Sequence, residues 1–167
     1  MTEPAGDRFV GVVVPEQRRI ARRFHELPLA QVRALLDSPF HEHRNTALLI
    51  LAEKVRRGDE RPLRLALLDE LAGSDDLWKR RVAVMSTRPF ILEGQFEPTL
   101  RLARRLLDDL HDLIHKAAGW MLREIGNRDV ATLTRFLDRH AARMPRTMLR
   151  YAIEKLSPTR RRRYMLA

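Results

Sequence analysis

Three side chains in the segment 111–129, HDLIHKAAGWMLREIGNRD, combine an aromatic ring with positive charge at helical spacing. Lys116 precedes Trp120 by four residues and Arg123 follows it by three, so on a helix all three project from one face. A Trp between two cations suits a surface that holds a polyanion and also stacks on a flat group. The spacing therefore predicts a nucleic-acid contact. The structural alternative for Trp120 is a ring that fills space between helices.

Apolar residues at three- and four-residue spacings place these side chains on an amphipathic helix over 112–125, which ends at Gly126-Asn127. The same pattern predicts helices elsewhere, and no segment shows the sustained alternation of a strand. We expect them over 15–27, 29–37, 40–57, 62–71, 77–92, 96–108, 129–142 and 146–156. Ser74, Asp75 and Asp76 should cap the helix that begins at Leu77, and Pro89 should end or kink it.

A 36-residue period relates several of these helices. Arg44, Arg80 and Lys116 are 36 residues apart, and Arg150 follows after a step of 34. Three residues after each of the first three cations stands a small residue: Ala47, Ala83 and Gly119. We interpret this as equivalent helices that pack closely at the small residue and expose the cation alike, although chance recurrence among many Arg and Ala residues is the alternative. The four cations are then candidate phosphate contacts, each steepening the salt dependence of binding by about one unit.

Such a period, with two helices in each repeat, is typical of HEAT or armadillo arrays. The predicted fold is all-α, a right-handed α-solenoid of about four HEAT-like helix pairs. With 167 residues, 44% of them hydrophobic and 32% charged, the chain has the composition of one globular domain over 1–167. The N-terminus lacks a signal-peptide pattern, and the longest apolar run, 47–52, is too short to span a membrane. We expect a cytoplasmic, nucleoid-associated monomer without membrane contact.

Positive charge points to the class of partner. Lys and Arg number 32 against 22 Asp and Glu, a net charge of +10, and nucleic acid is the commonest partner of so basic a domain. A GC-rich genome would explain the preference for Arg but not the sign of the charge. Within the basic C-terminal tail, 157–167, the run Arg160–Arg163 is either a phosphate anchor or part of a disordered solubilising tail.

Most of the chain resembles the DNA alkylation repair proteins of the AlkD type, which are HEAT-like repeat DNA glycosylases. The likeness rests on FVGVVVPEQRRIARRF, SPFHEHRNTALLILAEKVRRGD, the long block 76–129 and MPRTMLRYAIEKL. It implies a basic concave surface that cradles double-stranded DNA, and excision of N3- and N7-alkylated purines (3-methyladenine and 7-methylguanine) without base flipping. It also implies a cleft built from a Trp, an Asp four residues later, an Arg and a second Trp, of which Arg81 matches the Arg and Trp120 the second Trp.

The family's WDxxD segment is absent. It belongs between Gly58 and Leu77, where residues 59–76 are too few by about one helix pair, and the chain has only two Trp residues, Trp78 and Trp120. Since each repeat contacts only its neighbours, the loss of one unit can leave a foldable array. It removes the carboxylate, so we expect DNA binding with weak or absent base excision. Should excision survive, the substitutes to mutate first are Glu42, Asp75 and Asp76.

Two other hypotheses follow from the same residues. A helical array that binds proteins rather than DNA is the alternative function. His111 and His115 have a spacing that could ligate zinc, but the sequence offers no third ligand beside them, so we expect neither a metal nor a cofactor.

Overall fold

The computed structural model describes residues 8–57 and 61–166, and helices dominate both stretches. Within them the only β feature is an isolated parallel bridge between Arg8 and Phe40, so the all-α prediction is confirmed. Among these residues, no helix is both long and apolar enough to cross a membrane. The helices are α1 (Val14–Arg23), α2 (Leu29–Leu36), α3 (His41–Arg57), α4 (Arg61–Ala72), α5 (Leu77–Met85), α6 (Arg88–Leu92), α7 (Glu97–Arg105), α8 (Asp112–Arg128), α9 (Val130–His140), the 3-10 turn η1 (Ala141–Arg143), α10 (Arg146–Ile153) and α11 (Pro158–Met165).

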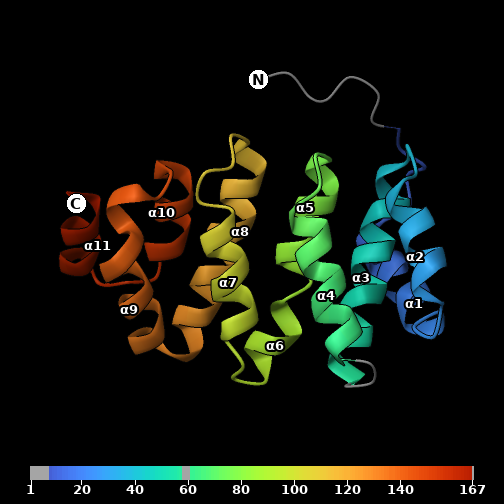
Figure 1. Cartoon of the computed structure of the whole chain (residues 1–167), viewed down its shortest axis with the longest axis horizontal. Coiled ribbons are helices and arrows are strands. Elements are labelled where there is room, and N and C mark those ends of the chain that lie inside the picture. The colour runs from blue at the N-terminus through green and yellow to red at the C-terminus, as the bar shows by residue number, and fades with distance from the viewer. Residues whose placement is uncertain (1–7, 58–60, 167) are drawn as a thin grey trace. The chain divides into compact units, whose positions relative to one another are not determined.

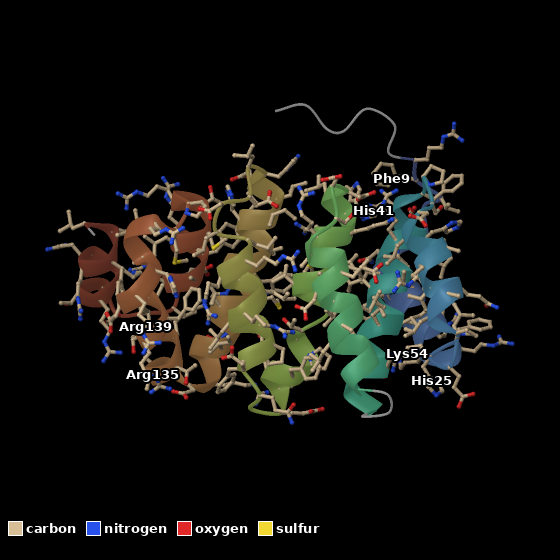
Figure 2. The ribbon with its side chains drawn as sticks, in the orientation of Figure 1. Phe9, His25, His41, Lys54, Arg135 and Arg139 are labelled. Atoms are coloured by element: carbon tan, nitrogen blue, oxygen red, sulfur yellow. The ribbon has the colours of Figure 1, made fainter. Side chains whose placement is uncertain are left out.

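Contacts divide the chain into two compact units, Met1–Arg61 and Pro62–Ala167. In the first unit, α1 and α2 pack against α3. The segment 8–13 precedes α1 and contacts the start of α3. There the Phe9 and His41 rings stack with their centroids 5.4 Å apart (Figure 2). The Glu42 carboxylate fixes this segment by accepting the Val10 and Gly11 amides at 3.0 and 2.9 Å. An apolar cavity of about 300 Å³ lies between the segment and the helices.

In the second unit, α8 is the central helix. It packs against α5 on one side and α10 on the other, and Figure 1 shows the three in that order. Helices α7 and α9 pack on α8 as a second layer. Arg101 links α7 to α4 through a 2.9 Å ion pair with Asp69. This arrangement places the side chains of α5, α8 and α10 beside one another.

Close packing at small residues, which the 36-residue period predicted, is confirmed. Ala47 and Ala83 have no exposed surface, and Gly119 is buried. A Cβ at Gly119 would stand 2.5 Å from Met148 O and 2.6 Å from Tyr151 Cβ, so only glycine lets α8 approach α10 this closely. The core around α8 includes its large buried side chains: Ile114, Met121, Leu122 and Ile125.

Several helix boundaries depart from the prediction; for example, the first helix ends at Arg23 rather than at residue 27. The helix expected over 77–92 divides into α5 and α6, because Pro89 cannot donate a backbone hydrogen bond and begins a new helix instead. Helix α8 continues three residues past its predicted end, to Arg128. Residues 158–165 form α11, anchored by buried Tyr164, rather than a disordered tail. The expected end of the third helix at Gly58 lies outside the described residues.

Candidate nucleic-acid interface on α5, α8 and α10

Trp120 lies half-buried on α8, and Glu124 lies one helical turn after it on the same helix. Its indole Nε1–H donates to Glu124 Oε1 at 3.3 Å, and Glu124 Oε2 lies 3.8 Å from Arg88 Nη2. Because residues four apart share a helix face, this carboxylate follows directly from the sequence WMLRE. Glu124 was not among the predicted site residues, although its i,i+4 spacing from Trp120 indicated the contact. The ring is therefore held at one edge and remains partly accessible.

The two cations that flank Trp120 each have a carboxylate partner. Lys116 Nζ lies 2.7 Å from Asp112 Oδ2, and this bond raises the pKa of Lys116 and lowers the pKa of Asp112. Arg123 forms an ion pair with Glu154, the residue that follows the end of α10. Both pairs are partly open to solvent, so each contributes little to stability. The cations keep their positions near Trp120 through these pairs, and a phosphate would compete for them.

Arg81 crosses from α5 to α8. Its Nη1–H donates to Leu113 O at 2.9 Å, and burial lowers the pKa of its guanidinium while the Tyr151 hydroxyl of α10 acts in the opposite direction. The positive charge of Arg81 also opposes that of Lys116, which places the two cations in one electrostatic neighbourhood. The structure therefore brings Arg81, Lys116, Trp120 and Arg123 together in one unit, on adjacent helices.

Arg44 and Arg80 make equivalent hydrogen bonds in two repeats, each to the carbonyl of a serine in the turn before its helix. Arg44 Nη1 donates to Ser38 O at 2.7 Å, and Arg80 Nη1 donates to Ser74 O at 2.9 Å, six residues back in each case. Each serine in turn accepts, at its Oγ, the amide of the second residue after it. Arg44 is only 6% exposed, so the expectation that the recurrent cations are exposed alike is wrong for Arg44, because its guanidinium turns inward to the helix-entry turn.

The third repeat has the same side-chain contact to a carbonyl six residues back, but the side chain that makes it stands one position earlier in the 36-residue period. His115 Nε2 lies 2.5 Å from Asp109 O, again six residues back, so its N–H must donate. Asp109 Oδ1 accepts the His111 amide, as the serines accept theirs. His115 is thus the structural counterpart of Arg80, and Lys116 is left to pair with Asp112. In the described part of the chain, no group of three or more His, Cys, Asp or Glu could hold a metal ion.

The remaining candidates fall into two kinds. Arg150 is exposed on α10, whereas the proposed substitutes for the missing carboxylate are largely engaged elsewhere. Asp76 Oδ1 accepts the Trp78 and Lys79 amides as the N-cap of α5, as predicted, and Glu42 belongs to the other unit and holds the 8–13 segment. Asp75 is exposed, and its carbonyl accepts from Arg80 at 2.8 Å.

Comparison with known proteins identifies the class. The family model described as "DNA alkylation repair enzyme" matches residues 4–64 and 55–156, which together span most of the chain. A solved structure of a predicted DNA alkylation repair enzyme from Enterococcus faecalis is similar in fold, with a TM-score of 0.56 and 16% identity over 90% of this chain and 89% of that one. Comparison with curated protein sequences gave no significant match.

The chain belongs to the DNA alkylation repair enzyme family. The predicted resemblance is confirmed, and membership supports a role in DNA repair. The two matched segments overlap at residues 55–64, close to the region 59–76 in which the sequence predicted the loss of about one helix pair.

Proposed function

We propose that this protein binds duplex DNA, alkylated or not, through the face built from α5, α8 and α10, with Trp120 and Arg81 at its centre. The observation that carries the proposal is the grouping of a half-buried Trp with Arg81, Lys116 and Arg123 in one unit. The indole is fixed at its nitrogen edge by Glu124 and is available for contact with a nucleotide. Cations on the same face would hold the phosphates on either side of it.

Excision should be weak or absent. Hydrolysis of an alkylated nucleoside needs a carboxylate that stabilises positive charge developing on the sugar and positions water. The sequence lacks the WDxxD segment that supplies this group in the family. Glu124, the carboxylate beside Trp120, is committed to the indole N–H and lies close to Arg88. We therefore infer recognition of DNA with little chemistry.

The test combines binding and excision on the same duplex, with and without methylation by a simple alkylating agent. We expect binding that weakens steeply between about 50 and 200 mM salt. Trp120→Ala should weaken it about tenfold, since stacking on one base is worth roughly 1–3 kcal/mol. Trp78→Phe is the matched control on the other Trp. Abasic sites should stay at background.

Either half can fail separately. Abasic sites well above background would overturn the loss of excision while leaving the binding face in place. Binding that is insensitive to salt and to Trp120→Ala would instead favour an array that recognises proteins.

A further inference from the structure

Most of the net positive charge of the chain lies in residues 128–166, which contain its last three α-helices. Residues 128–166 contain eleven Arg and Lys against three Asp and Glu, a net charge of +8, whereas the whole chain carries +10. The remaining residues are therefore close to neutral. So uneven a distribution gives one end of the chain a positive field that the average charge does not reveal.

The three carboxylates of this segment already have partners. Asp129 caps α9 by accepting the Thr132 amide at 3.0 Å, and Glu154 pairs with Arg123. Asp138 joins α9 to α11, because its Oδ1 accepts from Tyr164 Oη at 2.9 Å and from Arg163 Nη2 at 3.1 Å. Little negative charge is left to neutralise the other guanidinium groups.

Asp138 joins α9 to α11 through Tyr164 and Arg163, so the exposed arginines of these two helices lie on neighbouring elements. Helix α11 packs on α10 and η1, and Tyr164 is its buried anchor. Figure 2 shows Arg135 and Arg139 reaching from α9 into solvent. We define the C-terminal arginine surface as the exposed side chains on α9, η1 and α11: Arg135, Arg139, Arg143, Arg160, Arg161 and Arg162.

His140 lies inside this field. Burial lowers the pKa of its imidazole, and Arg104 of α7, Arg143 and Arg139 lower it further. The Phe136 ring lies tilted beside the His140 ring, with centroids 4.6 Å apart. Arg143 also has a carboxylate near it, Asp108 at 3.4 Å, and both of these side chains are largely exposed. The cations are near enough to repel a proton from His140, and a bound anion would relieve that repulsion.

We propose that the C-terminal arginine surface is a second DNA-binding surface, which holds duplex phosphates without regard to alkylation. The inference rests on the proposed function only in the choice of DNA as the polyanion. Guanidinium groups match phosphate oxygens in planar, bidentate geometry, and six exposed ones on adjacent elements suit a regularly charged backbone better than a scattered acidic patch. The surface supplies affinity, and the Trp120 face supplies discrimination.

The test measures affinity for a plain duplex across a salt series with the variant R160Q/R161Q/R162Q. Gln preserves helix propensity, and these three side chains are exposed, so α11 should remain folded. The matched control is R18Q/R22Q/R23Q, which removes the same charge from exposed positions of α1. We expect the α11 variant to reduce the slope of log K against log salt by about two to three, and the α1 variant by less than one.

Three results would overturn the proposal: equal slopes for the two variants, no change in either, or equally tight binding of polyglutamate or anionic vesicles that depends on the same arginines. The ratio of affinities for methylated and plain duplex separates this surface from the Trp120 face. This ratio of affinities should be unchanged in the α11 variant and should decrease in Trp120→Ala. If the parent protein binds methylated and plain duplex equally, discrimination by the Trp120 face is contradicted. The proposal for the C-terminal arginine surface would still hold if the slopes of the two variants differ as expected.

Discussion

Glu124 controls Trp120 at the scale of a single residue. Its carboxylate accepts the indole N–H at 3.3 Å while the side chain is only 20% exposed. It has two separable properties, an acceptor atom that orients the ring and a negative charge that would repel phosphate. The amide of Gln keeps the first and removes the second.

We expect Glu124→Gln to preserve the fluorescence spectrum of Trp120 and to bind duplex severalfold more tightly, because about one unfavourable charge contact is removed. Glu124→Leu should change the spectrum, since the indole loses its acceptor. Both are measured in the Trp78→Phe background, so that Trp120 is the only fluorophore of its kind. Identical spectra for the Gln and Leu variants would show that the hydrogen bond does not orient the ring.

Glu42 gives a pH-dependent prediction at the same scale. Its bonds to the Val10 and Gly11 amides lower the pKa of the carboxyl, with the Val10 bond the largest cause. A lowered folded-state pKa means that the stabilising contribution is complete above the unfolded value of about 4.3 and is lost as the pH falls through the folded value. Exchange of these two amides, corrected for the intrinsic rate, should therefore increase on acidification below about pH 4. Glu42→Gln should exchange faster at neutral pH and lose that acid dependence; an unchanged profile would contradict the assignment.

At the scale of elements, Arg80 joins two helix-entry turns. It donates to Ser74 O and Asp75 O, and its Nε lies 2.7 Å from Asp109 Oδ2, with side chains only 18% and 8% exposed. Arg80→Met keeps the stem and removes all three bonds, which leaves Asp109 poorly compensated. We expect a loss of about 2–3 kcal/mol in the free energy of unfolding. Arg150→Met, exposed on α10, is the control and should change stability by less than about 0.5 kcal/mol. Equal losses for the two variants would contradict a stabilising role for the three Arg80 bonds.

The helices were predictable because apolar spacing and proline act locally. Pro89 marked the break between α5 and α6, and the small residues at Ala83 and Gly119 marked close packing. The role of the recurrent cations was not predictable, since a basic side chain on a helix can reach solvent or turn back to a carbonyl, and that choice depends on the turn before it. The one-residue shift from Arg80 to His115 shows the limit: a fixed period of 36 selects Lys116, while the contact six residues back selects His115.

α11 and Glu124 were missed for different reasons. The short helix depends on Tyr164 reaching Asp138, a tertiary contact that periodicity cannot reveal. Glu124 lies at i,i+4 from Trp120 in the sequence, but the prediction for this helix face rested on its cations and did not include a hydrogen-bond acceptor. The candidate site was therefore located from sequence, and its hydrogen bonds required the fold.

For the whole molecule, two boundaries fall close together. The compact units divide between Arg61 and Pro62, and the two matched family segments overlap at 55–64. The loss of about one helix pair was predicted for the same region, residues 59–76. Each unit also has its own buried apolar core, with Ile50 and Leu51 in the first and Ile114 and Met121 in the second. The coincidence raises the question of whether 1–167 unfolds as the single domain that its length predicted.

Amide hydrogen exchange of two core variants tests whether the two compact units unfold together. Ile50→Ala and Ile114→Ala each remove a side chain that is at most 1% exposed, so each should cost roughly 3 kcal/mol. If the units are separate in stability, Ile50→Ala lowers amide protection in α1–α3 and leaves α8–α10 unchanged, while Ile114→Ala does the reverse. We expect this division, because each unit buries its own apolar side chains around its own central helix, α3 or α8. Equal loss of protection in both units from either variant would instead show that the chain folds as one cooperative domain.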